Sequence, residues 1–348
     1  MTGSDHSAPI LWFDTLGHDH HETGGWHPER AARLPAVAAA AAEPALAEAI
    51  RRGEARPATR TELERAHSSR YLDALTRQIE GGGGAIDTDT QTSPGSWDTA
   101  LWAAGSALCA AEELAADRAR SAFVAVRPPG HHATAAEAMG FCLINTIAVV
   151  AASLVANGAR VAIFDWDVHH GNGTQDIFWD DDQTLYASIH QHPAYPGTGR
   201  AGEVGGPKAK GNTVNVPLPA GASGHVALAA FDDLIGPEID RFAPDWILVS
   251  AGYDAHRSDP LGDLRWTAGD YHLLTKRVLS LVPAGRTLFL LEGGYDLGAL
   301  TRSVSGTLAA MAELSFDAPA MHEAPSSDGP GLEAVTVAAR RRDEALQA

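Results

Sequence analysis

The chain has 348 residues, of which 45% are hydrophobic and 20% charged, with 26 basic against 44 acidic side chains and a net charge of −18. This length suffices for one large α/β domain or two ordinary ones. The longest apolar stretch, around Ile147–Ala156, is far shorter than the roughly 20 residues that cross a bilayer, which excludes a membrane span. The negative charge repels phosphate backbones, so it argues against nucleic acid as a partner and favours a cationic substrate.

Two further features of the composition bear on compartment and chemistry. The N-terminal residues contain no basic segment ahead of an apolar one, so we predict no secretory signal and expect a cytoplasmic protein. Cys109 and Cys142 are too few for a disulfide framework or a four-thiolate zinc site. The 16 histidines, several of them in pairs, point instead to metal binding and acid–base catalysis.

Short apolar, β-branched runs alternate along the chain with segments of helical spacing, and such runs are typical of strands buried on both faces. The predicted strands are Ile10–Phe13, Phe123–Val126, Val161–Phe164, Leu185–Ile189, Trp246–Ser250 and Leu288–Leu291. The predicted helices are Pro28–Ala49, Glu62–Gln78, Trp97–Ala116, Thr146–Ala156, His225–Phe242, Tyr271–Leu281 and Leu300–Leu314. This alternation predicts an α/β fold built on a parallel sheet.

The order of these segments predicts one principal domain. No repeat at a fixed period and no long linker divides residues 1–315, so we expect a single catalytic domain there. Gly81–Gly84 and Pro196–Gly211 have the composition of long loops. The chain is polar and rich in Pro, Ser and Asp from Phe316 to Gly331, and a last helix is predicted over Leu332–Leu346. Residues 316–348 are therefore expected to form a polar linker and a C-terminal helix.

Four of the apolar runs lead directly into segments rich in histidine, glycine or acidic residues. AFVAV precedes RPPGHH, VAIF precedes DWDVHHGN, WILVS precedes AGYDAH, and TLFLL precedes EGGYD. Ligands of open parallel sheets bind outside the carboxyl ends of the strands. We therefore predict that these four strand ends converge on one site.

The segment DWDVHHGN has the spacing of a metal site. Asp165, Asp167 and His169 are two residues apart, which on an extended chain places their side chains on one side. Two of them can hold one metal ion, and Asp254, after a later strand, can be the third ligand. Such a set suits Zn²⁺ with a fourth position for water. An isolated D-x-H more often caps a helix or lines a solvated edge, but its combination with the other segments favours the metal.

His131, His132 and Tyr295 can supply the remaining chemistry of a hydrolytic site. The two histidines follow a rigid Pro-Pro-Gly turn, which can hold adjacent imidazoles at a cleft. Hydrolysis at a metal needs a base for water and an acid for the leaving group, and this pair can provide both. Tyr295 follows two glycines, so its phenol can reach a substrate oxygen. Taken alone, each of these signals is weak.

Taken together, these segments resemble the histone deacetylase superfamily, specifically its class II type with the bacterial histone deacetylase-like and acetylpolyamine amidohydrolases. The resemblance covers about residues 8–315 and rests on the motifs HPER, RPPGHHA, MGFCLIN, DWDVHHGNGTQ, SIHQHPAYPGTG, SAGYDAHRSDPLG and LEGGY. It implies an arginase/deacetylase-like fold with three αβα layers and a mainly parallel central sheet of about eight strands. It also implies that residues 1–315 are a deacetylase-like catalytic domain.

The resemblance implies a role for each of these site residues. Zn²⁺ would be held by Asp167, His169 and Asp254, and Tyr295 would polarise the acyl carbonyl. His131 and His132 would be the tandem histidines, the first oriented by Asp165 and the second by Asn172. Because a neutral Asn stabilises imidazolium less than Asp does, His132 is expected to be neutral and able to act as the base. A structural K⁺ is implied at Asp165, Asp167, His169, Ser188 and Ile189.

The same resemblance implies a substrate tunnel. Its walls would be the rings of Phe141 and Tyr195, and Gly140 and Leu261 would line the same site. An acidic residue on the rim would be Asp89 or, with a shifted register, Asp87. Apolar walls fit the uncharged aliphatic part of an acylated lysine.

The implied activity is zinc-dependent hydrolysis that removes acetyl or other acyl groups from N-acyl-lysine side chains or similar acylated amines. An acetylpolyamine amidohydrolase is the main alternative, favoured by the net charge of −18, although Leu261 stands where a polyamine-specialised relative has glutamate. A catalytically silent acetyl-binding protein and an arginase-like ureohydrolase are weaker alternatives. The natural substrate, acyl length, assembly into a homo-oligomer, the division of base and acid between the histidines, and the choice of Zn²⁺, Fe²⁺ or Co²⁺ stay open.

Overall fold

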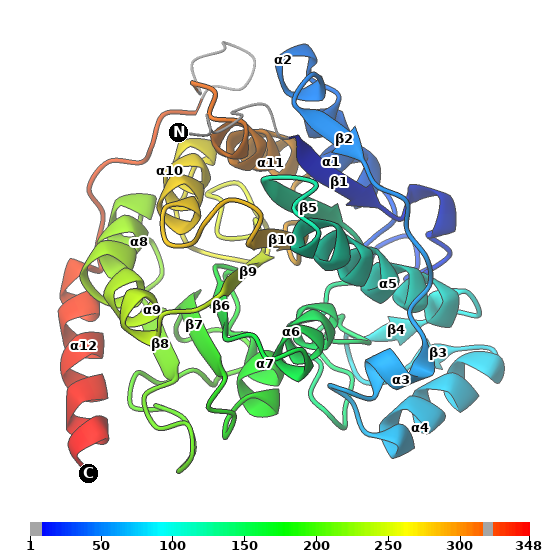
Figure 1. Cartoon of the computed structure of the whole chain (residues 1–348), viewed down its shortest axis with the longest axis horizontal. Helices are drawn as coiled ribbons and strands as arrows, with labels where there is room; N and C mark the ends of the chain where they lie inside the picture. The colour runs from blue at the N-terminus through cyan, green and yellow to red at the C-terminus, as the bar shows by residue number, and fades with distance from the viewer. Residues whose placement is uncertain (1–8, 316–322) are drawn as a thin grey trace.

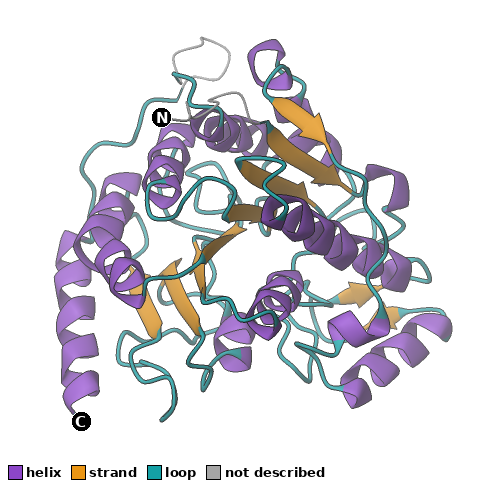
Figure 2. Ribbon diagram, viewed as in Figure 1, coloured by secondary structure: helices purple, strands orange, loops and turns teal. Residues whose placement is uncertain are grey.

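The computed structural model describes residues 9–315 and 323–348 and contains an eight-stranded parallel sheet (Figures 1 and 2). The strand order is β2-β1-β5-β10-β9-β6-β7-β8, and each pairing between neighbours is parallel. The strands are β1 (Ile10–Asp14), β2 (Ile50–Arg52), β5 (Ser121–Ala125), β6 (Val161–Asp165), β7 (Thr184–Gln191), β8 (Thr213–Leu218), β9 (Trp246–Ala251) and β10 (Thr287–Leu291). The predicted parallel sheet is therefore confirmed.

Successive residues of the central strands enter two different hydrophobic cores, one on each face of the sheet. Ile10 and Trp12 of β1 belong to one core, whereas Leu11 and Phe13 belong to the other. The first face is covered by α1 (Arg33–Ala41), α8 (Gly224–Ala230), α9 (Gly236–Phe242), α10 (Ala268–Leu279) and α11 (Leu297–Met311). The second is covered by α3 (Arg60–Leu63), α4 (Ser69–Glu80), α5 (Ser96–Ala115) and α6 (Thr146–Ala156). These three layers confirm the expected αβα architecture.

Two predicted helices are each interrupted. The segment predicted as Pro28–Ala49 contains only α1 and the short α2 (Pro44–Ala47), because Pro44 lacks the N–H that a continuing helix needs. The segment predicted as Glu62–Gln78 is divided into α3 and α4, because Ser68 adopts an extended conformation and caps α4 through the Tyr71 amide. By contrast, α8, a π-helical turn (Phe231–Ile235) and α9 follow one another over the single helix predicted at His225–Phe242.

Two strands of the main sheet are absent from the prediction. The short β2 lies at one edge, and β8, with the sequence TVNVPL, lies at the other. Pro217 in β8 donates no backbone hydrogen bond, which only an edge strand tolerates. Gly84 also begins a small hairpin of β3 (Gly84–Ala85) and β4 (Gln91–Thr92), whereas Pro196–Gly211 contains no helix or strand, as predicted.

The last helix, α12 (Leu332–Gln347), occupies the segment where a C-terminal helix is predicted and packs beside β8 (Figure 1). Arg342 is 2% exposed and donates hydrogen bonds to the carbonyls of Gly211 and Thr213, the first at 2.6 Å. It also lies 3.1 Å from Glu238 of α9. Residues 316–322 of the predicted linker lie outside the described residues. Among the residues that are described, no helix combines the length and apolar character that crossing a membrane requires.

Candidate active site

The carboxyl ends of β5, β10, β9 and β6, which are consecutive in the sheet, meet at one place, as predicted. Asp167 and His169 follow β6, and Asp254 follows β9. The candidate ligand atoms of these three residues all lie within 4.8 Å of one another. Both carboxylates are buried, whereas His169 retains some exposure. The tertiary structure therefore brings the three predicted metal ligands together.

The donor set of this cluster suits a metal cation. Nδ1 of His169 lies 3.1 Å from Oδ1 of Asp167 and 3.2 Å from Oδ2 of Asp254. Oδ2 of Asp254 is buried, and no described residue donates a hydrogen bond to it. Burial would lower the pKa of His169, but the carboxylates of Asp167 and Asp254 at these distances outweigh burial and raise the pKa to about 10. A bound cation can take the place of that imidazole proton and balance the carboxylates.

His131, in the loop that follows β5, is held by carboxylates at the carboxyl end of β6 and in the loop after it. Its Nδ1 lies 3.0 Å from Oδ2 of Asp165, and its Nε2 lies 3.8 Å from Oδ1 of Asp167. Tyr186 donates a second hydrogen bond to Oδ2 of Asp165 at 3.1 Å. Burial lowers the pKa of His131, but the charges of Asp167 and Asp165 outweigh burial and raise it to about 10. These carboxylates therefore favour the imidazolium form of His131.

His132 has a neutral partner instead. Its Nδ1 lies 2.8 Å from Oδ1 of Asn172, the first residue of α7 (Asn172–Ile177). An amide oxygen only accepts hydrogen bonds, so this partner assigns the proton to Nδ1 and leaves a lone pair on Nε2. Burial and the neighbouring positive charges of His131 and His169 hold the pKa of His132 well below its ordinary value. The pKa values of the two adjacent histidines are thus shifted in opposite directions.

Tyr295 closes the site from the end of β10. Its ring meets the ring of Phe141 edge-on at a centroid distance of 5.8 Å. The guanidinium carbon of Arg33 lies 5.0 Å from the centre of the Tyr295 ring. The side chain is 8% exposed, and burial raises the pKa of its phenol well above the ordinary value. The hydroxyl therefore remains protonated and can donate a hydrogen bond.

A cavity of about 260 Å³ leads to these groups and is lined by Asp89, His132, Gly140, Phe141, His169, Tyr195, Leu261 and Tyr295. Tyr195 and Leu261 are 39% and 38% exposed and form its mouth, whereas His132 and Tyr295 are buried. The lining includes each of the five residues predicted to bind substrate, which are Phe141, Tyr195, Leu261, Gly140 and Asp89.

The backbone approaches groups of the site closely at two glycines, of which Gly140 lines the cavity. Gly140 has a φ of +55°, and a Cβ atom there would lie 2.5 Å from Cδ2 of His132 and 2.9 Å from the Tyr195 ring. A Cβ atom on Gly293 would lie 2.2 Å from Oδ2 of Asp254. Any larger residue at either position would displace site groups.

Of the two candidate rim carboxylates, Asp89 lies at the cavity and Asp87 does not. Oδ1 of Asp87 accepts hydrogen bonds from the amides of Asp89 and Thr90 at 3.0 and 2.6 Å, so this side chain stabilises the turn. His27 of the HPER motif supports the same turn, because its Nε2 lies 3.0 Å from the Asp89 carbonyl and its ring packs edge-on against Phe141.

The residues predicted to hold K⁺ lie on two neighbouring strands and the loop that follows β6. Asp165 of β6 is directly paired with Ser188 of β7, and Ile189 is the next residue along β7. Ser188, Ile189 and Asp165 are all buried. Oγ of Ser188 lies 2.9 Å from Nδ1 of His190. The assignment of K⁺ to this set stays a prediction.

Glu292, the last polar residue before the glycines of EGGYD, is a site residue that the sequence did not identify. Its Oε2 accepts hydrogen bonds from the amides of Gly130 and His131 at 2.6 and 3.2 Å, and its Oε1 accepts from Ser250 at 3.1 Å. Burial raises its pKa to about 7. Glu292 therefore connects the histidine loop after β5 with the tyrosine loop after β10. A carboxylate directly after the buried run TLFLL is the signal that could have revealed it.

A buried ion-pair chain behind the site also escaped the sequence-based prediction. Arg33 donates to the carbonyls of Glu292 and Gly294, the second at 2.7 Å, and lies 3.2 Å from Glu29. Glu29 receives two hydrogen bonds from Arg127 at 2.7 and 2.6 Å. Burial would raise the pKa of Glu29, but the charge of Arg127 outweighs burial and lowers it to about 2. The arginines thus tie the β10 end to α1 and β5.

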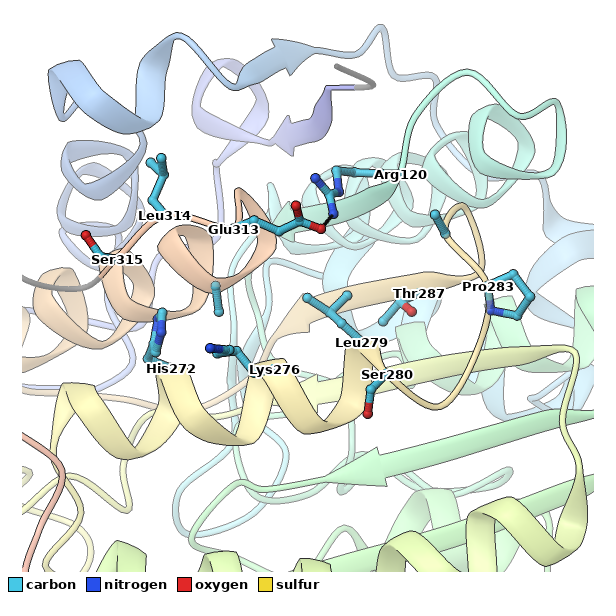
Figure 3. Close-up of a pocket in the computed structure, with 12 residues that line it drawn as sticks. Arg120, His272, Lys276, Leu279, Ser280, Pro283, Thr287, Glu313, Leu314 and Ser315 are labelled. Atoms are coloured by element: carbon cyan, nitrogen blue, oxygen red, sulfur yellow. Dashed lines mark hydrogen bonds and ion pairs between the residues drawn. The ribbon is translucent and has the colours of Figure 1, made fainter. Parts of the chain in front are cut away.

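A second cavity, of about 650 Å³, lies near the amino ends of the strands (Figure 3). Arg120 and Thr287 on its wall stand at the amino ends of β5 and β10, whereas the metal-ligand cluster lies at the carboxyl ends. Arg120 forms an ion pair with Glu313, and Lys276 of α10 also faces the cavity (Figure 3). None of the predicted site residues lines this cavity.

The fold and the strand-end cluster define an arginase/deacetylase-like α/β protein with a candidate metal centre. A family model described as the histone deacetylase domain matches residues 27–311, and the chain belongs to the histone deacetylase family of hydrolases. A probable deacetylase of Archaeoglobus fulgidus is 39% identical over 94% of this chain and 90% of that protein. A histone deacetylase-like amidohydrolase of Pseudomonas aeruginosa is 36% identical over a segment that covers 69% of this chain and 65% of that protein. The crystal structure of the HDA15 HD domain matches with a TM-score of 0.87 and 36% identity, covering 97% of this chain and 95% of that chain.

Proposed function

We propose that the protein is a zinc-dependent amidohydrolase that removes acetyl or other short acyl groups from N-acyl-lysine side chains or similar acylated amines. The observation that carries the proposal is the cluster of Asp167, His169 and Asp254, with His132 and Tyr295 beside it at the buried end of a narrow cavity. A cluster of candidate ligand atoms beside an imidazole and a phenol that line one cavity supports this proposal.

Asp167, His169 and Asp254 would hold the metal, and the two carboxylates with one imidazole suit Zn²⁺, although Fe²⁺ and Co²⁺ accept the same ligands. The metal would supply a Lewis acid that lowers the pKa of water and polarises the acyl carbonyl. K⁺ would stabilise the neighbouring strand ends through Asp165, Ser188 and the backbone of Ile189. Both metals are parts of the proposal.

His132 is the proposed general base. It is neutral, its Nδ1 proton is bound to Asn172, and its Nε2 has a lone pair. In this state it can take a proton from the attacking water, and it can return that proton to the departing amine. The adjacent imidazolium of His131 stabilises negative charge that develops on the acyl oxygen, because its own proton is retained by Asp165 and Asp167.

Tyr295 is the proposed donor to the acyl oxygen. Its phenol is protonated and buried, so a hydrogen bond from it acts in a low-dielectric environment where it stabilises an oxyanion strongly. Phe141 supplies an apolar wall for the aliphatic chain of the substrate. A cavity volume of about 260 Å³ supports a substrate that enters by one aliphatic arm.

An acetylpolyamine amidohydrolase is the second candidate, because the net charge of −18 and the Asp89 carboxylate at the cavity favour a substrate that keeps a cationic amine. Leu261 at the mouth favours the acyl-lysine substrate instead, since an apolar residue there offers no counter-charge to a second amine.

The test compares release of acetate from an acetyl-lysine peptide and from N-acetylputrescine, each with and without a chelator. We expect turnover of the peptide to exceed that of the polyamine and to disappear with the chelator. Preference for N-acetylputrescine would establish the second candidate. Turnover that survives complete removal of metal would contradict the metal-dependent mechanism.

A further inference from the structure

One buried carboxylate connects the loop of the catalytic tyrosine with the loop at the mouth of the cavity. Oδ2 of Asp259 accepts hydrogen bonds from the amides of Tyr295 and Asp296 at 2.6 and 3.2 Å. Its Oδ1 accepts from the amide of Leu261 at 3.0 Å. Asp259 is 7% exposed and lies five residues after the metal-ligand candidate Asp254. Neither oxygen touches the cavity that holds the reacting groups.

The tyrosine loop depends on such an external anchor. Tyr295 follows Gly293 and Gly294, and Gly294 has a φ of +116°. Because glycine has many accessible backbone conformations, these two residues alone do not fix the direction of the backbone at Tyr295. The ring of Tyr295 packs against Phe141 and Arg33, and the position of its hydroxyl also depends on the backbone of this loop. On one side Arg33 binds the carbonyls of Glu292 and Gly294. On the other side, Asp259 is the acceptor of the Tyr295 and Asp296 amides among the described residues.

The chemistry of this position requires a carboxylate. Three N–H donors converge on two oxygens, and an isosteric Asn would turn an NH₂ group toward at least one of them. Burial and the neighbouring Asp254 raise the pKa of Asp259 to about 7, and the three donors oppose a further rise. A charged acceptor of several backbone amides forms short, strong hydrogen bonds.

We propose that Asp259 is a positioning residue for acyl transfer to water, which fixes the Tyr295 phenol relative to Leu261 at the cavity mouth. The predicted effect of Asp259 on turnover rests on the proposed function, whereas its predicted effect on the position of Tyr295 does not. Asp259 does not touch the substrate, and its effect on turnover passes through the backbone of Tyr295. Removal of the carboxylate therefore costs transition-state stabilisation only while the phenol hydroxyl is present.

The first experiment is a double-mutant cycle with Asp259→Asn, Tyr295→Phe and the double variant, each assayed for kcat and KM. We expect Asp259→Asn to lower kcat by roughly 10-fold or more with a much smaller change in KM, in line with a loss of transition-state stabilisation. In the Tyr295→Phe background the same change should alter kcat less than about threefold. An equal loss of kcat in both backgrounds would overturn the proposal and indicate an effect on the metal site.

The second experiment does not depend on turnover. The chain has six tyrosines, so incorporation of 3-fluorotyrosine yields six ¹⁹F lines, and Tyr295→Phe identifies the line of Tyr295. We expect Asp259→Asn to shift or broaden this line and to leave the lines of Tyr71 and Tyr186 unchanged, since these two rings belong to the core on the other face of the sheet. An unchanged Tyr295 line would overturn the proposal. Absence of turnover with every acylated amine would contradict the proposed function alone.

A matched control is available on the same loop. Asp263 is exposed and contacts Gln191 rather than the tyrosine loop. Asp263→Asn should therefore leave both kcat and the Tyr295 fluorine line unchanged. Asp259→Ser, whose smaller side chain retains one hydrogen-bond acceptor, serves as the second variant. A thermal unfolding midpoint near that of the wild type shows that a variant is folded, and only folded variants are compared.

Discussion

The side-chain oxygen of Asn172 lies 2.8 Å from Nδ1 of His132. This contact leaves His132 without a carboxylate partner of its own, although His131 beside it faces Asp165 and Asp167. Burial and the positive charge of His131 then keep His132 neutral, while the carboxylates keep His131 charged. The site thus shifts the pKa values of two rings whose centres are 4.0 Å apart in opposite directions.

Asn172→Asp should raise the pKa of His132, because a carboxylate at 2.8 Å stabilises the imidazolium form. The acidic limb of the kcat/KM profile should move to higher pH by about one unit, with lower activity at neutral pH. The measurement is kcat/KM between pH 5 and 9, with Asn157→Asp, on the far end of α6, as the control. An acidic limb that stays in place would contradict the assignment of His132 as the base.

Tyr295→Phe should lower kcat by about 10²- to 10³-fold, the usual loss when one donor to a developing oxyanion is removed. KM and metal content should change little, because the ring still packs against Phe141 and the phenol is not among the candidate ligands. Steady-state kinetics and elemental analysis check both parts. Full turnover in this variant would refute the role of the phenol.

Asp254→Ala should abolish stoichiometric metal binding, since it removes one of three candidate ligands and leaves His169 with a single carboxylate. The measurement is the metal-to-protein ratio after dialysis against Zn²⁺, which does not require a substrate. Asp263→Ala, an exposed aspartate on the same loop, is the control. Retention of one tightly bound Zn²⁺ in the Asp254 variant would place the metal elsewhere.

His67 should make the folded state sensitive to acid. Its Nδ1 lies 2.9 Å from the carbonyl of Thr134, and its Nε2 accepts from the amide of Asn145 at 2.9 Å, which only a neutral ring can do. Burial lowers its pKa to about 4. Because the folded pKa is below the ordinary 6.5, the unfolded chain binds the proton first, and stability present above pH 6.5 is lost as the pH falls toward 4.

His67→Gln should remove this part of the acid sensitivity. Between pH 7.5 and pH 5 the free energy of unfolding should fall by about 2 kcal/mol less in the variant than in the wild type. Urea unfolding at the two pH values measures the difference, and the comparison of slopes is unaffected by a uniform loss of stability. His225→Gln at an exposed position is the control. Identical slopes for His67→Gln and wild type would contradict the neutral buried histidine.

Arg342→Ala should destabilise the fold by roughly 3 kcal/mol, because two buried carbonyls and Glu238 lose their charged donor. The neighbouring Arg341, whose side chain is 60% exposed, supplies the control, and Arg341→Ala should change the free energy of unfolding by less than about 0.5 kcal/mol. Equal effects of the two substitutions in urea unfolding would show that α12 does not anchor the β8 edge.

The elements that the sequence predicted well are those whose signal is local. The short apolar runs Val161–Phe164 and Trp246–Ser250 predict buried strands from their composition alone. The polar residues that follow these runs predict a shared site, because the carboxyl ends of parallel strands meet at one edge of the sheet. Asp167, His169 and Asp254 follow from this rule together with ligand chemistry. The edge strand β8 was missed, because Asn215 and Pro217 interrupt its apolar pattern and only its place at the sheet edge makes them acceptable.

The sequence by itself thus determined the parallel α/β sheet and which strand ends carry chemistry, since periodicity and composition are properties of neighbouring residues. Only the tertiary structure decided that Asp89 rather than Asp87 lies at the cavity and that Arg127 binds Glu29 across 98 residues of sequence. The same holds for Asp259 and the Tyr295 amide. Burial and electrostatic coupling depend on which distant segments come into contact, and no local pattern contains that information.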